Sequence, residues 1–167
     1  MRAVLNAGIL VASIALGLAD RAAAEDGCRQ FAWSIERERQ WFGDGFTAKV
    51  ESGLALPKDG VFTLLLQPVG KVIYRVPPDR GRDDGMGGIV TLEWAAAGRY
   101  QVTLSSHAWM DVVQDDRRLP ILGSTGRWDC PGIRLSVQFE IADSSALTFQ
   151  FGGASVRHLD VAVRRAW

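Results

Sequence analysis

Three side chains of different chemistry stand at alternate positions of one short segment: His107, Trp109 and Asp111. If that segment is a β-strand, all three point to the same face, because side chains alternate between the two faces of a strand. An imidazole, an aromatic ring and a carboxylate on one face can bind a sugar or another polar ligand. The alternative is structural: Trp109 covers an edge of the core, while Asp111 pairs with a nearby arginine or accepts hydrogen bonds from turn N–H groups.

Metal chemistry is restricted by the histidine count, since His107 and His158 are the only two in the chain. Both histidines with one of Asp111, Glu140 or Asp160 would supply the donor types that hold Fe(II) in non-haem oxygenases. Such a triad would use every histidine present. We therefore predict no metal site, and we assign no residue a catalytic role, because the chain also lacks a Gly-x-Ser-x-Gly nucleophile motif.

A second group of metal donors consists of Asp79, Asp83 and Asp84, whose carboxylates are the ligand type that Ca²⁺ prefers. Their spacing differs from the alternate acids of an EF-hand loop. Arg80 and Arg82 stand between them and would repel a cation. We expect a solvated loop here instead of a calcium site.

The N-terminus has the order of a secretory signal peptide. Arg2 supplies a positive charge, residues 3–19 are almost wholly apolar, and residues 22–24 are small alanines. We predict a signal peptide over residues 1–24 and one mature domain over residues 25–167, located in the periplasm or secreted. The apolar run is shorter than the roughly 20 residues of a membrane span, so we expect no span after cleavage.

The chain has two cysteines, Cys28 and Cys130. In an oxidising compartment, an isolated pair most simply forms one disulfide. The alternative, a redox-active pair, lacks support because the chain has no Cys-x-x-Cys motif. We predict a structural bridge that ties the start of the mature chain to a point about a hundred residues later, a long loop by the standards of disulfide stabilisation.

The elements that must position these side chains are mostly strands. Six runs alternate apolar and polar residues with a period of two, and turn-forming residues separate them. The runs cover residues 61–66, 90–94, 100–105, 134–141, 147–151 and 158–164. The pattern predicts a mainly β fold, an antiparallel β-sandwich of jelly-roll type with about eight strands.

One short helix is expected before the strands. Ser34 can cap its start and Gly43 can end it. The charged run at 36–39 is expected to form its solvated face. Trp33 and Trp41 beside that run offer an aromatic platform for a ligand, as an alternative to packing on the core.

Composition excludes several classes of protein. The 19 Lys and Arg balance the 19 Asp and Glu, so the chain lacks the basic footprint of a nucleic-acid-binding protein. A hydrophobic content of 47% excludes a disordered chain. Residues 77–88 fit no strand and are rich in glycine and charge, which is typical of a functional or mobile loop.

Two family resemblances add to this interpretation. The segment Gly98–Leu104, then Trp109–Val113 and the strands around Leu147 and Val161 resemble the second half of bacterial pre-peptidase-type β-sandwich domains. Those domains open a strand with Gly-x-Tyr and carry an aspartate in the next strand. The resemblance implies a jelly-roll-like accessory module without catalytic activity.

The second resemblance spans nearly the whole chain. The segment Ala108–Gln114, the Cys-Pro-Gly-x-Arg segment at 130–134 and the Val-x-Val strand at 161–163 are similar to a group of small secreted proteins of Gram-negative bacteria. Some members are labelled homogentisate 1,2-dioxygenase, which implies an Fe(II)-dependent, ring-cleaving oxidoreductase. True homogentisate dioxygenases resemble cupins, and this chain has no His-x-His pair of the cupin kind.

The sequence therefore predicts an exported accessory or binding protein of the cell envelope, without a cofactor. His107, Trp109 and Asp111 are its expected contact residues. Its partner would be an envelope component, a carbohydrate or a protein, and not a nucleic acid. The alternative is a homogentisate 1,2-dioxygenase-like oxidoreductase with Fe(II), which metal analysis of the mature protein would reveal.

Overall fold

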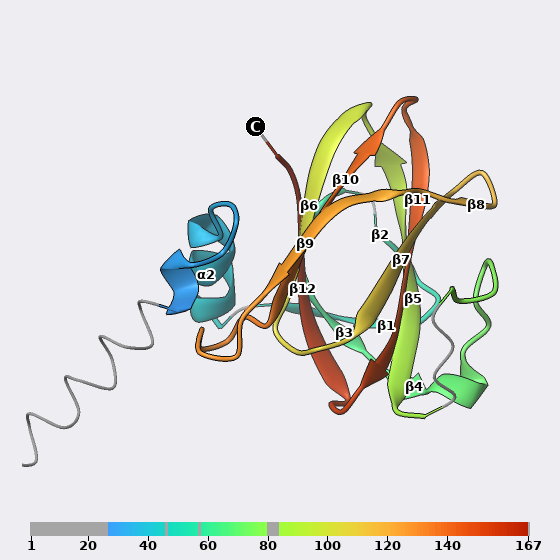
Figure 1. Cartoon of the computed structure of the whole chain (residues 1–167). Helices are drawn as coiled ribbons and strands as arrows, with labels where there is room; N and C mark the ends of the chain where they lie inside the picture. The colour runs from blue at the N-terminus through green and yellow to red at the C-terminus, as the bar shows by residue number, and fades with distance from the viewer. Residues whose placement is uncertain (1–26, 46, 57, 80–83, 167) are drawn as a thin grey trace, which may run out of the picture.

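The protein is a β-sandwich of two sheets that face each other (Figure 1). The computed structural model describes residues 27–45, 47–56, 58–79 and 84–166, so the predicted signal peptide lies outside it. Sheet A has the order β1 (Ala48–Glu51), β3 (Gly60–Leu65), β12 (His158–Arg165), β6 (Gly98–Leu104), β10 (Leu135–Ile141), β9 (Ile121–Gly126). Sheet B has the order β2 (Ala55–Leu56), β5 (Met86–Ala95), β11 (Ser145–Ala154), β7 (Trp109–Gln114), β8 (Arg117–Arg118), with β4 (Gln67–Pro68) paired to β5.

The predicted mainly β sandwich is confirmed. It is antiparallel except at one edge of each sheet, where β1 pairs with β3 in sheet A and β2 pairs with β5 in sheet B, both in parallel. The described part of the chain contains twelve strands, more than the eight or so expected. The difference comes partly from β2, β4 and β8, which have two residues each and are too short to show a period. The loop expected at 77–88 is also shorter, because β5 begins at Met86.

The core lies between the two sheets and consists of the apolar halves of the alternating runs. Phe139 of sheet A is fully buried and packs on Tyr100 of the same sheet and on Phe149 of sheet B, with ring centroids 5.8 and 6.0 Å apart. Burial of each such side chain contributes about 1.5–3 kcal/mol. In the described part of the chain, no helix is long and apolar enough to cross a membrane.

Helix α2 (Glu36–Gly43) packs on the outer face of sheet A and contacts β12 and β3. The prediction that the charged run at 36–39 is solvated is wrong for Glu38, which is 0% exposed. Its Oε1 accepts hydrogen bonds from Gln101 Nε2 at 2.8 Å and Arg164 Nε at 2.5 Å. The reason is that the outer face of sheet A is polar beneath the helix, so a carboxylate docks there.

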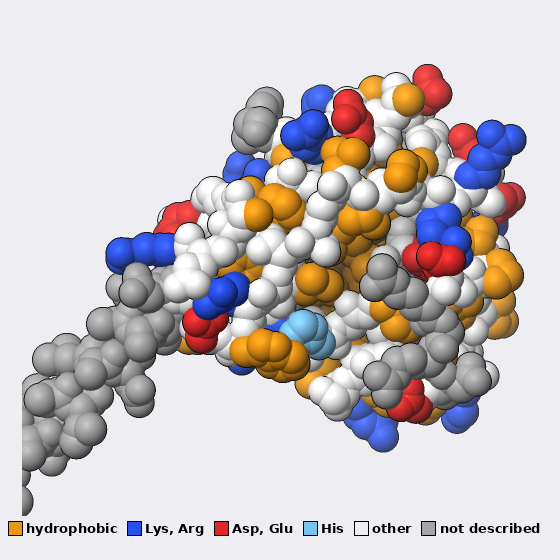
Figure 2. Space-filling model, viewed as in Figure 1, with side chains coloured by type: hydrophobic (Ala, Val, Ile, Leu, Met, Phe, Trp, Pro, Cys, Tyr) orange, Lys and Arg blue, Asp and Glu red, His pale blue; other side chains and the backbone are white. Residues whose placement is uncertain are grey.

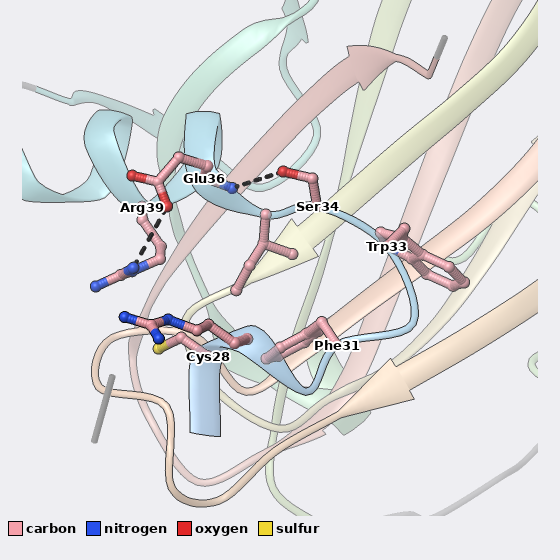
Figure 3. Close-up of a pocket in the computed structure, with 8 residues that line it drawn as sticks. Cys28, Phe31, Trp33, Ser34, Glu36 and Arg39 are labelled. Carbon is pink, nitrogen blue, oxygen red and sulfur yellow. Dashed lines mark hydrogen bonds and ion pairs between the residues drawn. The ribbon is translucent and has the colours of Figure 1, made fainter. Parts of the chain in front are cut away.

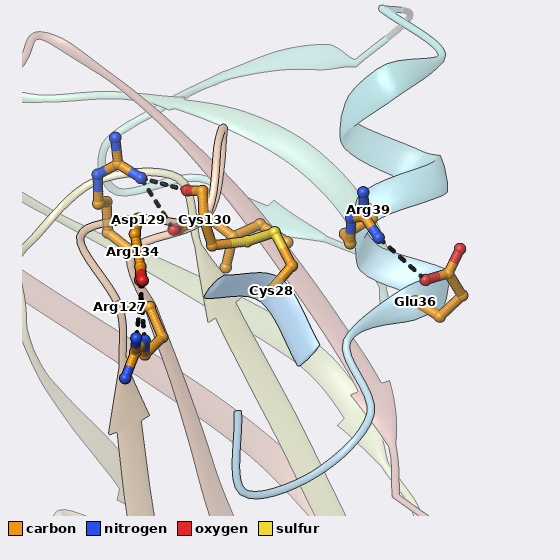
Figure 4. Close-up of a disulfide and its surroundings, with 8 residues drawn as sticks. Cys28, Glu36, Arg39, Arg127, Asp129, Cys130 and Arg134 are labelled. Carbon is orange, nitrogen blue, oxygen red and sulfur yellow. Dashed lines mark hydrogen bonds and ion pairs between the residues drawn. A yellow bond between two sulfur atoms is a disulfide. The ribbon is translucent and has the colours of Figure 1, made fainter. Parts of the chain in front are cut away.

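The predicted disulfide between Cys28 and Cys130 is present, with the Cα atoms 4.6 Å apart (Figure 4). Both cysteines are buried in a small apolar cluster with Phe31, Ile35 and Ile133. The bridge fastens the segment before α2 to the connection between β9 and β10. It therefore holds the N-terminal segment on the rim of sheet A.

A hollow of about 370 Å³ lies between this segment and the first turn of α2 (Figure 3). Cys28 and Phe31 form one side of it, and Glu36 and Arg39 line the other. The last two pair with each other at 3.4 Å. Because the apolar groups belong to the disulfide cluster and these charges are matched, we interpret the hollow as a seam in the packing.

Candidate functional site

A cleft of about 380 Å³ opens where β7 and β8 of sheet B approach β9 and β10 of sheet A. β8 pairs with the end of β7, at Val113 and Gln114, and Leu119 N–H donates to Val112 O, so within the described residues the first half of β7 has an unpaired edge on this side. Most of the residues that line the cleft have apolar side chains, among them Ala108, Met110, Leu119, Pro120, Ile121, Leu135 and Val137. Figure 2 shows hydrophobic side chains gathered in a hollow of this face, beside a basic and an acidic side chain in contact.

One end of the cleft is charged. Arg118 Nε lies 3.1 Å from Asp111 Oδ1, and Arg118 Nη1 lies 3.7 Å from Asp79 Oδ1. Arg118 Nη2 also donates to the carbonyl oxygen of Pro77. Among the described residues that line this end, two carboxylates and one guanidinium leave an excess of one negative charge. The structural alternative for Asp111, pairing with a nearby arginine, is therefore what the structure shows.

Asp111 is only 8% exposed, and its Oδ2 atom has no hydrogen-bond partner among the described residues. A buried, unpaired carboxylate oxygen is costly because it has lost its hydration. The ion pair with Arg118 offsets part of that cost. The arrangement holds the guanidinium at the mouth of the cleft, where its side chain remains 32% exposed.

Residues 72–79, which we call the covering segment, cross the outer face of sheet B. Tyr74 donates its hydroxyl hydrogen to the carbonyl oxygen of Phe151 at 3.0 Å. Val76 exchanges two hydrogen bonds with the side chain of Gln150, at 3.0 and 3.1 Å. The segment thereby buries Asp111 and positions Asp79 beside the cleft.

Trp109 lies under the covering segment, with its ring centroid 5.4 Å from that of Tyr74. Its other neighbour is the backbone of β11. A Cβ atom at Gly152 would lie 2.3 Å from Trp109 Cζ2, so this position requires glycine. Trp109 lines the cleft, but its Nε1 atom is buried without a partner in the described structure.

His107 lies apart from the other two expected contact residues. It precedes β7, in a turn where Ser105 exchanges hydrogen bonds with Asp160 of β12. The shared strand face therefore extends over Trp109 and Asp111 only. His107 packs instead against Trp128, with ring centroids 4.0 Å apart, and does not line the cleft.

The donor set for iron is not assembled. Within the described residues, no three His, Cys, Asp or Glu side chains are grouped so that they could hold a metal ion. That statement covers His107 and His158 together with Asp111, Glu140 or Asp160, the triad that Fe(II) would need. For the calcium hypothesis, Asp83 lies outside the described residues and Asp79 faces Arg118.

Arg118 is the residue of the candidate site that sequence reasoning missed, although a signal for it exists. β7 and β8 form a hairpin whose two turn residues, Asp115 and Asp116, have φ angles of 51° and 58°. Aspartate is among the residues that suit such tight turns. The turn pairs Arg118 with Val113, and because Asp111 is two residues before Val113, Arg118 projects from the same face as Asp111.

Fold and cleft together define a class: a disulfide-linked β-sandwich protein with a partly apolar cleft at one edge. No family model, curated protein or solved structure matches this chain significantly. The two family resemblances inferred from motifs therefore stay predictions, and the function must be argued from the site itself.

The covering segment predicts an alkaline transition. Burial, and secondarily the negative charge of Asp111, raise the pKa of Tyr74 from 10.0 to about 12. A phenol whose pKa is higher in the folded than in the unfolded state stabilises the fold fully below pH 10, and this stabilisation is lost as the pH rises toward 12. We expect tyrosinate absorbance to appear at higher pH in the native than in the urea-unfolded protein.

Tyr74→Phe provides the control for this titration. Burial also raises the pKa of Tyr100, so both tyrosines of the chain titrate late in the native state. The variant should remove one of these two late steps. A tyrosine that titrates near pH 10 in the native protein and disappears in Tyr74→Phe would show that the covering segment does not bury this phenol.

Proposed function

We propose that this protein is an exported binding protein of the cell envelope whose ligand is a small amphiphile with an apolar body and a cationic or hydrogen-bond-donating end. The single observation that carries the proposal is the cleft: a partly apolar wall that ends at Asp111, Arg118 and Asp79. Its volume of about 380 Å³ is within the range of small-molecule sites. The disulfide supports export, because such bridges persist in oxidising compartments.

The charges at the cleft favour a particular ligand end. Asp79 is 69% and Arg118 32% exposed in their side chains, so both are accessible from solvent. Asp111 is buried behind them and makes the net charge of these three side chains negative. A ligand ammonium or hydroxyl group can therefore approach Asp79, while an anionic group would be repelled. The apolar body gains about 25 cal/mol for each Å² of its surface removed from water.

Binding explains the polar groups better than catalysis does. The Asp111 carboxylate is engaged by Arg118, and Arg118 by Asp111, Asp79 and a backbone carbonyl. Each of these groups already has a structural partner and serves to fix the position of the others. A rigid polar end is suited to recognition, because fewer side chains must be ordered when the ligand binds.

The test uses N-phenyl-1-naphthylamine, a neutral apolar fluorophore, with wild-type protein and two variants of β9. Ser124 is exposed and lines the cleft, so Ser124→Trp should fill it and weaken probe binding about tenfold, equivalent to about 1.4 kcal/mol. Leu122 is 52% exposed on the same strand and does not line the cleft. Leu122→Trp is therefore the matched control and should bind the probe like the wild type.

Competition then reports on the charged end of the cleft. Dodecylamine should displace the fluorophore at lower concentration than dodecanoate, because the excess charge at Asp79, Arg118 and Asp111 is negative. The proposal fails if the probe shows no saturable binding, or if Ser124→Trp and Leu122→Trp behave alike. Preference for the carboxylate would refute the assignment of the ligand end.

A further inference from the structure

A second surface with binding chemistry lies on the outer face of sheet A, away from the cleft. Two hollows of about 330 and 350 Å³ share Arg37 of α2 and Arg164 of β12 as lining residues. The first is also lined by Trp41 and Lys58, and the second by Trp33. Because they share these two residues, the hollows adjoin each other beside α2, and we call them together the outer groove.

The outer groove has a positive charge that the chain as a whole lacks. Among the described residues, Arg37, Lys58, Arg164 and Arg165 line it, against a single carboxylate, that of Asp59. Arg164 is matched by the buried Glu38, which leaves an excess of two positive charges. Among the described residues, no carboxylate lies within ion-pair distance of Arg37 or Lys58, and both side chains are exposed. These two cations are therefore available to an anionic ligand.

The guanidinium groups are held in place. Arg37 lies over the ring of Trp41, with its Cζ atom 5.0 Å from the ring centroid. Arg164 Nη2 donates to the carbonyl oxygen of Ser34 at 3.2 Å, in addition to its bond to Glu38. Arg165 Nη2 donates to Ala97 O at 2.9 Å. Prior ordering of long side chains lowers the entropy lost on binding.

The uncharged groups of the outer groove are those that recognise sugars. A tryptophan lines each of its two hollows, and Trp33 is anchored by a hydrogen bond from its Nε1 to Ser136 Oγ at 2.8 Å. The side-chain amide of Gln138 lines the floor between sheet and helix, and its Nε2 is held by the buried Gln101 at 3.1 Å, which leaves its oxygen for a ligand. Aromatic rings pack on the C–H faces of sugars, and amides exchange hydrogen bonds with hydroxyl groups.

We propose that the outer groove binds an acidic oligosaccharide whose carboxylates pair with Arg37 and Lys58. Two hollows in series suit an extended chain better than a single inorganic anion, because each exceeds the size of one oxyanion. The site is distinct from the amphiphile cleft and shares no lining residue with it. The protein would thereby attach to an acidic glycan through one surface and hold a small ligand at another.

The experiment is isothermal titration calorimetry with hexagalacturonate at low salt. The double variant Arg37→Gln/Lys58→Gln should weaken binding about tenfold or more, since it removes two charge-assisted contacts. Lys49→Gln/Lys71→Gln is the matched control, because both lysines are exposed, neither lines the outer groove, and the change in charge is the same. The control should bind hexagalacturonate as the wild type does, to within about twofold.

Other outcomes would contradict the proposal that the outer groove binds an acidic oligosaccharide. Equal loss in both double variants, or equally tight binding of single-stranded DNA of the same charge, would show only non-specific attraction of polyanions. If neutral maltohexaose binds as tightly as hexagalacturonate, the cations do not contribute to recognition. If hexagalacturonate shows no saturable binding, the proposed site is refuted. Ser124→Trp should leave hexagalacturonate binding unchanged, and a loss there would place the sugar in the cleft.

Discussion

Replacement of Arg164 by methionine is expected to lower the free energy of unfolding by about 3–5 kcal/mol, the cost typical of removing one partner from a buried ion pair. The variant leaves Glu38 fully buried, with Gln101 as its remaining hydrogen-bond donor among the described residues. Glu38 Oε2 already lacks a hydrogen-bond partner in the described structure, so no other donor is in place to stabilise the carboxylate when Arg164 is removed. Urea denaturation followed by tryptophan fluorescence measures the change.

The second half of this prediction is a double-mutant cycle. Glu38→Met/Arg164→Met removes the charge together with its partner and should recover most of the lost stability, because apolar replacement of a buried pair is often neutral. Glu36→Met, on the exposed side of α2, should change stability by less than about 0.5 kcal/mol. If Arg164→Met alone lowers the free energy of unfolding no more than Glu36→Met does, the docking of α2 does not depend on the ion pair between Glu38 and Arg164.

The same pair shows why part of the fold was beyond sequence analysis. Glu38 is one of four consecutive charged residues, and its neighbours give no sign that it is buried. Its partners Gln101 and Arg164 are 63 and 126 residues away in the chain. Only the assembled sheet brings them together, because alternation within a strand indicates which face a residue takes and not which element covers that face.

Strands could be predicted from the sequence only where one face of the strand is buried. β6, β10, β11 and β12 overlap runs of alternating residues because one face of each strand is in the core. β9 is missed because it is a mostly exposed edge strand, so neither face demands apolar side chains. The disulfide was predictable from the cysteine count alone, since two cysteines allow a single pairing.

Only part of the candidate site could be predicted from the sequence. Trp109 and Asp111 share a strand face as their spacing indicates, whereas His107 precedes the strand and takes no part. Arg118 depends on recognising a tight turn, and the apolar wall comes from strands distant in the chain. A cleft between two sheets has no local sequence signature, because each lining residue is an ordinary strand or loop residue by itself.

Removal of the disulfide by Cys28→Ala/Cys130→Ala is expected to lower the free energy of unfolding by about 4 kcal/mol, because the bridge closes a loop with a sequence separation of 102. Alanine is preferred to serine because both positions are buried, and the hydroxyl group of a serine there would have no hydrogen-bond partner. The chain-entropy account places the effect in the unfolded state, which expands without the cross-link. It therefore also predicts a larger dependence of stability on urea, as more surface becomes exposed on unfolding.

The native fold of this variant should persist, because Glu38 and Arg164 still dock α2 on sheet A. Wild-type protein treated with a reductant should match the variant, which separates the effect of the bridge from that of the substituted side chains. Combination of Cys28→Ala/Cys130→Ala with Arg164→Met tests the mechanism further. If the bridge and the ion pair both hold the N-terminal segment, their effects will be non-additive; additive losses would mean that the disulfide acts only on the unfolded chain.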